Sequence, residues 1–503
     1  MGSFELADLD RFRGIVAARL GLQFDDGKKE LLADVLRQRL QAHGQAEAAT
    51  YLAYLSSGPN GREELRALAT HLTVTETYFF RDSNQIHALT ESALPACIRV
   101  RAADRRLRLL SAGCASGEEA YSLAILLRER FPELGSWQIE ILGLDLNPAM
   151  IAKARKARYH KWSLRDTPDA LRDKYFRING ADYVLDEGIH GMASFEEQNV
   201  ARSDLASLNG FDIILCRNMI MYLVPEAAQS VIRTLTQALA PGGFLFLGYA
   251  ETLRGLSHDF HLLHTHEAFY YQKRPETGQP PPSSSKAQPF TVATPLVDPP
   301  DIAWVDAVRR ASERIESLSR DCTARIEPLP KVAGCSPVDL GFVFELLRQE
   351  RFREALVVLG KVSPEAPRDP DVQILQAGLL TNCGDLETAE QVCGRILAAD
   401  DLNAGAHYLT AVCREHAGDS NAAMEHDRAA IYLDGAFAMP HLHLGRMAKR
   451  SADLTTARRE LEQAGVLLSR EDPSRILLFG GGFSREALLA FSRAELRACG
   501  GSS

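Results

Sequence analysis

A glycine turn between a predicted strand and a predicted helix carries two acidic residues. Residues 109–122 read LLSAGCASGEEAYS, in which an apolar run is followed by a turn and then by Glu118 and Glu119. Such a turn can hold a phosphate, a dinucleotide or an adenosyl cofactor. A pyrophosphate would be repelled by the two carboxylates at the helix N-terminus, where it should be attracted. S-adenosylmethionine carries a sulfonium and an ammonium and has no phosphate, so the acids favour this methyl donor.

Polar residues also follow the next predicted strands. Asp145 ends the run IEILGLD, Asn199 follows FEEQ, and Arg217 and Asn218 follow FDIILC. The carboxyl ends of parallel strands lie at one edge of a sheet, where ligands bind, so we expect these residues to converge on one cleft. Asp145 can accept both ribose hydroxyls, but Asp145 or Asn147 can also simply cap the following helix. The sequence leaves both roles open.

The elements that must position these residues follow from the hydrophobic pattern. Short apolar runs alternate with helix-length amphipathic stretches between residues 107 and 272, and this pattern predicts a mostly parallel α/β sheet covered on both faces. Residues 5–72 have helical periodicity broken by Gly21 and Gly44, which predicts a small all-α unit. The apolar runs are 107–112, 139–145, 211–216 and 243–249.

The C-terminal third contains a repeat of 34 residues. Ala355, Ala389, Ala423 and Ala457 share this interval, and an aspartate precedes each of the last three by four residues. Period and pattern resemble the tetratricopeptide repeat, in which paired helices stack into a concave surface that can bind a partner. The tail 477–491, LLFGGGFSREALLAF, is too rich in glycine to continue the repeats, and no function for it follows from the sequence.

The segment before the repeats has the composition of a linker. Residues 275–300 contain eight prolines and the run SSS, a composition that buries too little apolar surface to fold alone. Beyond them, residues 302–318 fit either one amphipathic helix or a further spacer.

Composition excludes several classes of function. The net charge of −9 gives no electrostatic footprint for a nucleic acid. The nine cysteines lack a CxxC pair and indicate reduced thiols in a cytoplasmic protein. No apolar run is long enough to cross a bilayer, so direct membrane insertion is not expected. The histidines between 258 and 266 fall on both faces of a predicted strand, and we expect no metal site.

Together these motifs resemble the CheR family, S-adenosylmethionine-dependent methyltransferases that esterify glutamate side chains of bacterial chemoreceptors. The resemblance covers residues 5–273 and rests on TETYFFR (75–81), ASGEE (115–119), Asp145, CRN (216–218) with Tyr222, and PGG (241–243). It implies cofactor contacts at Thr75, Thr77, Arg81, Glu118, Asp145, Asn199, Val200, Arg217 and Asn218. The best-known members have Asn at the position of Thr75, which changes one contact and not the class.

The resemblance also implies a domain plan and partners. We expect a small antiparallel insertion at 171–192, chemoreceptor cytoplasmic domains as substrates, and recruitment to membrane-associated receptor arrays. A separate protein partner is expected on the repeats. The predicted regions are an N-terminal helical domain (5–80), a Rossmann-like methyltransferase domain (81–273), a linker and spacer (274–335), tetratricopeptide repeats (336–470) and a tail (471–503).

Methylation of a carboxylate needs no general base, because glutamate is already ionised at neutral pH. Catalysis must instead hold one oxygen in line with the methyl carbon. Arg81 and Tyr222 are the catalytic candidates, since a guanidinium and a hydroxyl can both donate to a carboxylate. Lys28, Lys29, Arg37 and Arg39 form a candidate basic face for an acidic receptor, or an ordinary solvated helix face. A methyltransferase acting on another acceptor and a non-catalytic cofactor-binding scaffold are the alternatives.

Overall fold

The computed structural model describes residues 5–45, 47–56, 58–202, 209–274, 340–349, 351–360 and 370–500. The chain divides into two compact units, residues 1–284 and 285–503, and each is described by itself. Apart from Arg274, the predicted linker and spacer, including 302–318, lie outside the described residues. Among the helices of the described ranges, none is both long enough and apolar enough to span a membrane.

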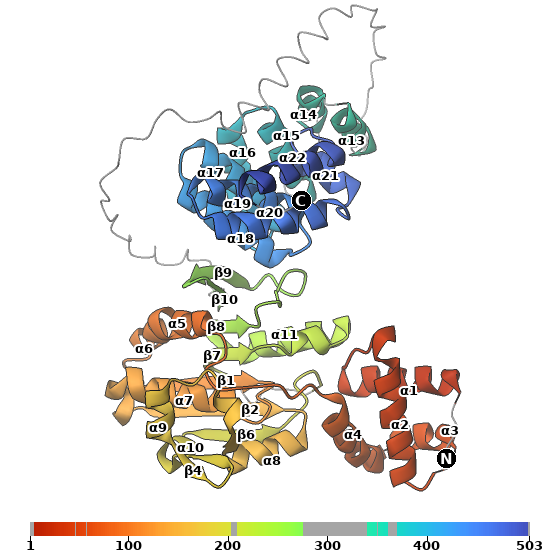
Figure 1. Cartoon of the computed structure of the whole chain (residues 1–503), viewed down its shortest axis with the longest axis vertical. Coiled ribbons are helices and arrows are strands. Elements are labelled where there is room, and N and C mark those ends of the chain that lie inside the picture. Colours follow the sequence, from red (N-terminus) through yellow and green to blue (C-terminus); the bar gives the residue numbers. More distant parts are fainter. Residues whose placement is uncertain are drawn as a thin grey trace, which may run out of the picture. The chain divides into compact units, whose positions relative to one another are not determined.

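The first unit begins with a small helical domain, as the periodicity predicted (Figure 1). Residues spaced three or four apart on the first helix, Leu9, Phe12, Val16 and Leu20, are buried against the other helices. A buried carboxylate ties this domain together, because Glu64 accepts hydrogen bonds from Arg39 and from Tyr51. The four helices are α1 (Leu6–Leu20), α2 (Lys29–Ala42), α3 (Ala48–Ser56) and α4 (Gly58–Leu72).

A seven-stranded sheet forms the core of the first unit, with the order β6-β2-β1-β7-β8-β10-β9. Strands β6, β2, β1, β7 and β8 are parallel, and β10 and β9 extend the β8 edge in antiparallel fashion. All six residues of β7 are buried, as expected for a strand covered on both faces. The strands are β1 (Arg106–Ala112), β2 (Gln138–Asp145), β6 (Ala193–Glu197), β7 (Phe211–Cys216), β8 (Leu239–Leu247), β9 (Phe260–Thr265) and β10 (Ala268–Lys273).

The strand order reverses beside β1, which has β2 on one side and β7 on the other. In open α/β sheets, ligands bind at the carboxyl ends of the strands at this point of reversal. The major helices of this domain are α5 (Ser83–Ala88), α6 (Leu94–Val100), α7 (Glu118–Arg130), α8 (Pro148–Lys156) and α11 (Pro225–Ala238), with a π-helical turn η2 (Leu89–Ala93) between α5 and α6.

The predicted antiparallel insertion is present and is larger than expected. It contains a three-stranded sheet in which β5 pairs with both β3 and β4. It begins at β3, before residue 171, so the sequence prediction missed its first strand. Its elements are β3 (Arg158–His160), η4 (Lys161–Leu164), α9 (Asp169–Tyr175), β4 (Phe176–Asn179), β5 (Asp182–Leu185) and α10 (Glu187–His190).

The second unit consists of paired helices, and the 34-residue pattern has a physical cause at each position. The recurring alanines Ala355, Ala389, Ala423 and Ala457 have no exposed surface, so the two helices of a pair can pack closely there. The recurring aspartates are N-caps, because Asp385, Asp419 and Asp453 each accept a hydrogen bond from a backbone N–H three residues later. The repeats are therefore confirmed.

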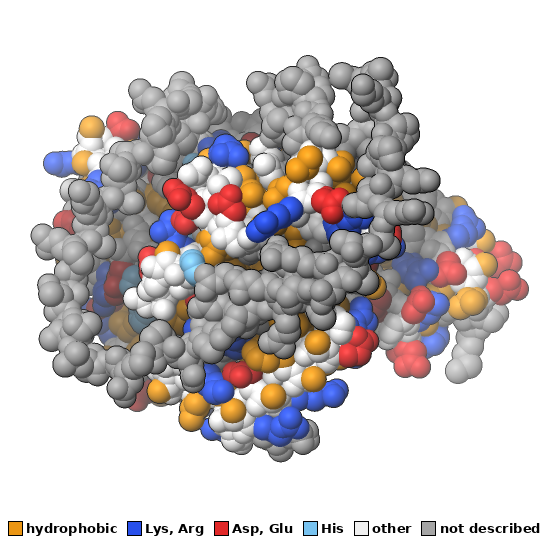
Figure 2. Space-filling model, turned by 90° about the horizontal axis from the view of Figure 1, so that it is seen from above, with side chains coloured by type: hydrophobic (Ala, Val, Ile, Leu, Met, Phe, Trp, Pro, Cys, Tyr) orange, Lys and Arg blue, Asp and Glu red, His pale blue; other side chains and the backbone are white. Residues whose placement is uncertain are grey.

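The repeat helices are α13 (Leu340–Arg348), α14 (Phe352–Gly360), α15 (Pro370–Asn382), α16 (Leu386–Ala399), α17 (Ala404–His416), α18 (Ser420–Leu433), α19 (Ala438–Arg450) and α20 (Leu454–Leu468). The glycine-rich tail adds no further repeat. It forms α21 (Pro473–Phe479) and α22 (Arg485–Ala498), and both helices pack on the repeats. On the face shown in Figure 2, basic and acidic side chains are interspersed among apolar ones.

Candidate active site

A cavity of about 240 Å³ opens at the carboxyl ends of the parallel strands. Its walls come from the turn after β1, the ends of β2, β6 and β7, the loop 73–81 and the N-terminal helical domain. Nine of the ten predicted site residues line it: Thr75, Thr77, Arg81, Asp145, Asn199, Val200, Arg217, Asn218 and Tyr222. The fold therefore brings together residues that lie up to about 150 positions apart in the sequence.

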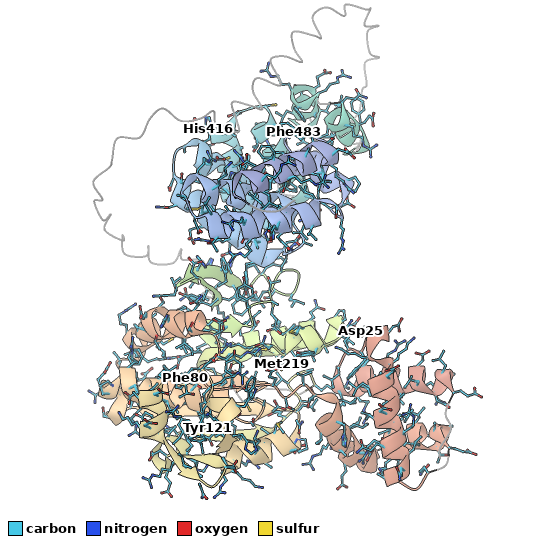
Figure 3. All side chains as sticks on the ribbon, viewed as in Figure 1. Asp25, Phe80, Tyr121, Met219, His416 and Phe483 are labelled. Carbon is cyan, nitrogen blue, oxygen red and sulfur yellow. The ribbon has the colours of Figure 1, made fainter. Side chains whose placement is uncertain are left out.

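The turn after β1 needs its two glycines. Gly113 and Gly117 have φ angles of +77° and +90°. A Cβ on Gly117 would lie 3.0 Å from the side chains of Ala154 and Phe195, and one on Gly113 would lie 3.0 Å from Met219 Sδ. Met219, labelled in Figure 3, also lines the cavity. The glycines thus let the turn approach the loop after β7.

Asp145 holds the same turn from the neighbouring strand. Its Oδ2 accepts a hydrogen bond from the Ala115 N–H at 2.8 Å, and its Oδ1 accepts one from the Asn147 N–H at 2.7 Å. The cap of α8 is Asn147, whose side chain accepts from the N–H groups of Ala149 and Met150. Burial raises the pKa of Asp145. The helix is therefore capped without Asp145, whose carboxylate lines the cavity and keeps free lone pairs for hydroxyl donors.

Glu118 is the one predicted site residue that does not line the cavity, so its contact with the cofactor stays a prediction. Its side chain is buried behind the turn, where it accepts hydrogen bonds from Ser116 at 2.7 Å and Ser163 at 3.0 Å. Burial raises the pKa of Glu118. Its neighbour Glu119 lines the cavity instead and accepts a hydrogen bond from Ser111 at 2.7 Å. Successive residues of a helix point about 100° apart, so only one of the two acids can face the cavity.

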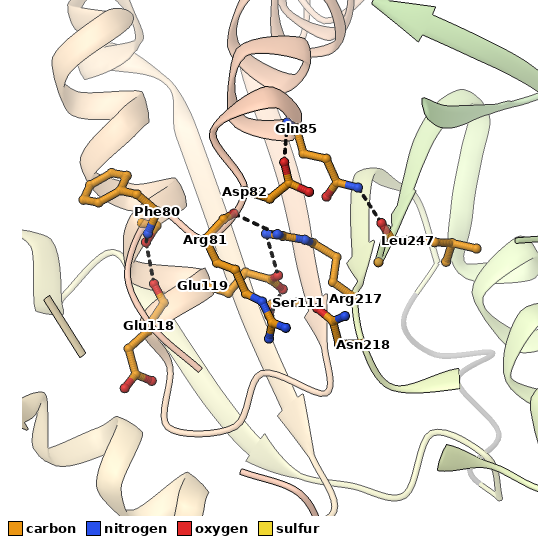
Figure 4. Close-up of polar contacts among 12 residues, drawn as sticks. Phe80, Arg81, Asp82, Gln85, Ser111, Glu118, Glu119, Arg217, Asn218 and Leu247 are labelled. Atoms are coloured by element: carbon orange, nitrogen blue, oxygen red, sulfur yellow. Dashed lines mark hydrogen bonds and ion pairs between the residues drawn. The ribbon is translucent and has the colours of Figure 1, made fainter. Parts of the chain in front are cut away.

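Arg217 connects the acidic turn with the loop that carries Arg81 (Figure 4). Its Nη2 donates to the backbone oxygen of Arg81 at 2.7 Å, and its Nη1 lies 3.4 Å from Glu119 Oε2. Its side chain is only 7% exposed. The buried Nε has no hydrogen-bond partner among the described residues, so a donor remains available beside the cavity.

A residue that the sequence analysis did not single out shapes the loop after β7. Glu251 is buried and accepts backbone N–H hydrogen bonds from Asn218 at 2.7 Å, Gly248 at 2.8 Å and Met221 at 3.1 Å. It thereby holds Asn218 in a left-handed conformation with φ of +57°. The only available signal was an acid shortly after the apolar run 243–249.

The two catalytic candidates lie in different walls of the cavity. Arg81 donates to the Glu76 backbone oxygen at 3.3 Å, and its guanidinium lies 5.6 Å from the ring centre of Tyr78. Tyr222 lies in the short helix η5 (Ile220–Tyr222), and its backbone oxygen accepts a hydrogen bond from the N–H of Gln23. The helical domain therefore forms part of the wall next to Tyr222.

The candidate basic face on the helical domain is broken up by internal ion pairs. Lys29 pairs with Asp26, Arg37 with Asp34, and Arg39 with the buried Glu64. Lys28, in contrast, lines the cavity, and its ammonium lies 5.8 Å from the ring centre of Tyr222.

The remaining predicted contacts are placed by the strand ends and the connecting loop. Asn199 Oδ1 accepts from the Ala201 N–H at 3.1 Å, and Val200 is buried beside it. Thr75 and Thr77 lie in the loop 73–81. Within the described residues, no group of three potential ligands is arranged to hold a metal ion.

The residues present fit S-adenosylmethionine. Asp145 and Glu119 offer carboxylates for hydroxyl and ammonium groups, and the unpartnered Nε of Arg217 suits a carboxylate. Since a phosphate would meet two acids here, the charges of the cavity disfavour a nucleotide.

Comparisons with known proteins agree with this geometry. The family described as CheR methyltransferase, SAM binding domain, matches residues 75–269, and the CheR methyltransferase all-alpha domain matches residues 7–73. A tetratricopeptide repeat family matches residues 346–413. Chemotaxis protein methyltransferase 2 of Vibrio cholerae is 31% identical over 277 residues, which cover 54% of this chain and 96% of that protein.

Two further relatives match along most of the chain. The probable biofilm formation methyltransferase WspC of Pseudomonas putida is 28% identical over 461 residues, covering 90% of this chain and 97% of that protein. Its counterpart in Pseudomonas aeruginosa is 25% identical over 459 residues, covering 90% and 98%. The chain therefore belongs to the CheR family of methyltransferases and carries tetratricopeptide repeats after its catalytic domain.

Proposed function

We propose that this protein transfers a methyl group from S-adenosylmethionine to glutamate side chains of methyl-accepting chemotaxis proteins. The observation that carries the proposal is that Arg81, Tyr222 and Lys28 line the same cavity as Asp145 and Glu119. One cavity thus holds both cationic and hydroxyl donors and acids that suit a cationic cofactor. The names of relatives in the same family, which are chemotaxis protein methyltransferases, support this choice of substrate.

When bound, S-adenosylmethionine supplies an electrophilic methyl group. The chain's own contribution is to bind and orient the acceptor. We assign Arg81 and Tyr222 to a glutamate carboxylate, which they can hold by two donors without removing a proton, since the carboxylate is already ionised. Lys28 adds positive charge at the same wall and attracts the acidic side chain. The apolar residues of the cavity exclude water and so desolvate the reacting oxygen.

The repeats are proposed to dock a protein partner of the signalling pathway, which would bring the catalytic domain to receptor arrays. Two relatives that match both the catalytic domain and the repeats are named probable biofilm formation methyltransferases. We therefore favour a chemosensory pathway that controls surface attachment as the setting for this enzyme.

The test is to incubate the protein with methyl-labelled S-adenosylmethionine and receptor cytoplasmic fragments and then to add base. A glutamyl methyl ester releases labelled methanol, whereas a methylated nitrogen keeps its label. Base-stable label would establish a different acceptor, and absence of label with intact cofactor binding would establish a scaffold. Either result overturns the proposal.

Matched variants test the two catalytic assignments. Tyr222→Phe and Arg81→Ala should each lower the rate of ester formation roughly 100-fold, because a misplaced acceptor oxygen costs about this much. Tyr183→Phe, in β5, and Arg99→Ala, at an exposed position on α6, change the same groups outside the cavity and should keep the wild-type rate. Wild-type rates in Tyr222→Phe and Arg81→Ala would refute both roles.

A further inference from the structure

The tail helix α21 lies against the first helices of the repeat pairs. Leu477 and Leu478 pack on the apolar cluster that Val343 and Leu347 of α13 form with Leu375 and other residues. Leu478 also reaches Gly378 of α15. One short helix therefore contacts the inner helices of separate repeats.

Phe479, the last residue of α21, extends this contact to the later repeats. Its ring centre lies 5.0 Å from that of Phe437, which precedes α19, and 5.9 Å from that of Tyr408 in α17. Tyr408 also donates its hydroxyl to the Phe479 backbone oxygen at 3.3 Å. We call the surface formed by α13, α15, α17 and Phe437 the inner groove.

The inner groove is shaped to receive this segment. A Cβ on Gly378 would lie 2.7 Å from Leu478 Cδ1, and a Cβ on Gly405 would lie 2.9 Å from Phe479 Cζ. A side chain at either position would therefore require Leu478 or Phe479 to shift. Two helical glycines at these two points carry a cost in helix stability, which their fit to Leu478 and Phe479 explains.

Closing the end of the helical stack does not account for α21, because α22 does this. The hydroxyl of Ser492 in α22 donates to the Leu461 backbone oxygen of α20 at 3.0 Å, and Glu495 pairs with Lys449 of α19. The linker between α21 and α22, residues 480–484, begins with three glycines, and Gly481 and Gly482 have positive φ angles. This linker lets α21 leave the groove without moving α22.

The segment fills the groove incompletely. Leu477, Leu478 and Phe479 remain partly exposed although α21 is seated. Beside them an open cavity of about 450 Å³ is lined by Leu347, Phe352 and Phe483, the last of which is labelled in Figure 3. A ligand with a better fit would gain apolar contacts that α21 does not make.

A polar contact completes the recognition pattern. Arg475 Nη2 lies 2.7 Å from Asp434 Oδ2, and its guanidinium lies 4.3 Å from the ring centre of Phe437. Arg475 precedes Leu478 by three residues and Phe479 by four, so all three fall on one face of a helix. Together with Asp434, the inner groove therefore fits a basic residue that is followed three residues later by an aliphatic residue and four residues later by an aromatic one.

We propose that the inner groove docks a helical turn with this pattern from a partner protein, and that residues 473–479 occupy the groove in cis until the partner displaces them. The proposal rests on the docking role of the repeats and not on the acceptor chemistry. While residues 473–479 occupy the groove, the apparent affinity for the partner is the intrinsic affinity multiplied by the fraction of molecules whose groove is open.

A labelled peptide of residues 471–483, EDPSRILLFGGGF, tests this by fluorescence anisotropy with the full chain. Replacing both Leu478 and Phe479 by Ser in the chain empties the groove, and this released variant should bind the peptide at least about tenfold more tightly than wild type. Adding Gly405→Leu to the released variant should abolish binding. Ser474→Ala, at an exposed position of the same helix, is the matched control and should bind like wild type.

Equal binding by the wild type and the folded released variant, or none by either, would overturn the proposal. If the released variant does not fold, hydrogen exchange on the wild type decides: excess peptide should speed exchange in residues 473–479 and leave α22 unchanged, and no change would count against displacement. Methanol release is not measured here, so failure would leave the proposed methyl transfer standing.

Discussion

Glu251→Gln should loosen the loop after β7, whose residues Arg217, Asn218 and Met219 line the cavity. Glu251 is 4% exposed, and its carboxylate accepts hydrogen bonds from the backbone N–H groups of Asn218, Met221 and Gly248. The N–H groups of Asn218 and Gly248 both reach Oε2, whereas that of Met221 reaches Oε1. These bonds hold Asn218 at φ of +57°, a conformation that a non-glycine residue adopts at a cost.

The size of the effect follows from the number of acceptors. A glutamine has one carbonyl oxygen, which can keep the pair of hydrogen bonds at Oε2, while its amide group meets the Met221 N–H donor to donor. Loss of one hydrogen bond to a charged group costs roughly 1.5–3 kcal/mol. For a unit of this size, each kcal/mol lowers the melting temperature by about 2–4 °C, so we expect a fall of roughly 3–12 °C.

Calorimetry of the full chain measures this fall. The transition of the first unit is the one that S-adenosylmethionine raises, because a ligand stabilises the unit that binds it. Glu196→Gln, an exposed change of the same type in β6, is the control and should leave the transition in place. An unchanged melting temperature together with unchanged cofactor affinity in Glu251→Gln would refute the role given to this carboxylate.

Three further changes test other parts of the molecule. Arg217→Lys should weaken S-adenosylmethionine binding roughly tenfold, because the single ammonium nitrogen of lysine cannot replace three separate guanidinium nitrogens that face Arg81, Glu119 and the cavity. Equal affinity by titration calorimetry would contradict this. Burial raises the pKa of Glu118 above its usual 4.5, so wild-type stability should fall as pH rises from 4.5 through the raised pKa. Glu118→Gln should flatten this part of the pH profile of the melting temperature. An unaltered slope would show that the pKa of Glu118 is not raised by burial. Ala452→Gly should stabilise the repeats by about 0.5–1 kcal/mol in urea unfolding, because Ala452 has φ of +64° and the equivalent residues Gly384 and Gly418 are glycines. A lower urea midpoint for the variant would contradict this.

Local chemistry made much of this protein predictable. The strand, glycine turn and helix at residues 109–122 could be predicted because each of these elements has a short-range sequence pattern. The repeat was readable because stacking of identical units places the same demand every 34 residues: a small residue between helices, as at Ala389, and a capping acid, as at Asp385.

Which neighbouring side chain faces the cavity was decided only by tertiary structure. Glu118 and Glu119 are chemically equal in the sequence, and the packing of α7 against the sheet turns one inward to Ser163 and the other toward Arg217. Leu31 fits the apolar period of α2, yet 46% of its surface is exposed, because it lines the cavity next to Lys28.

By itself, then, the sequence determined the family, the cofactor class, the repeats and the strand ends at which ligands bind, since all of these rest on short-range patterns. The tertiary structure decided what depends on contacts between distant residues. Glu251 reaches back to Asn218, and the glycine-rich tail places Phe479 against Tyr408. The pairing of two surfaces far apart in the chain leaves no periodic trace in either, because their complementarity exists only once both have folded.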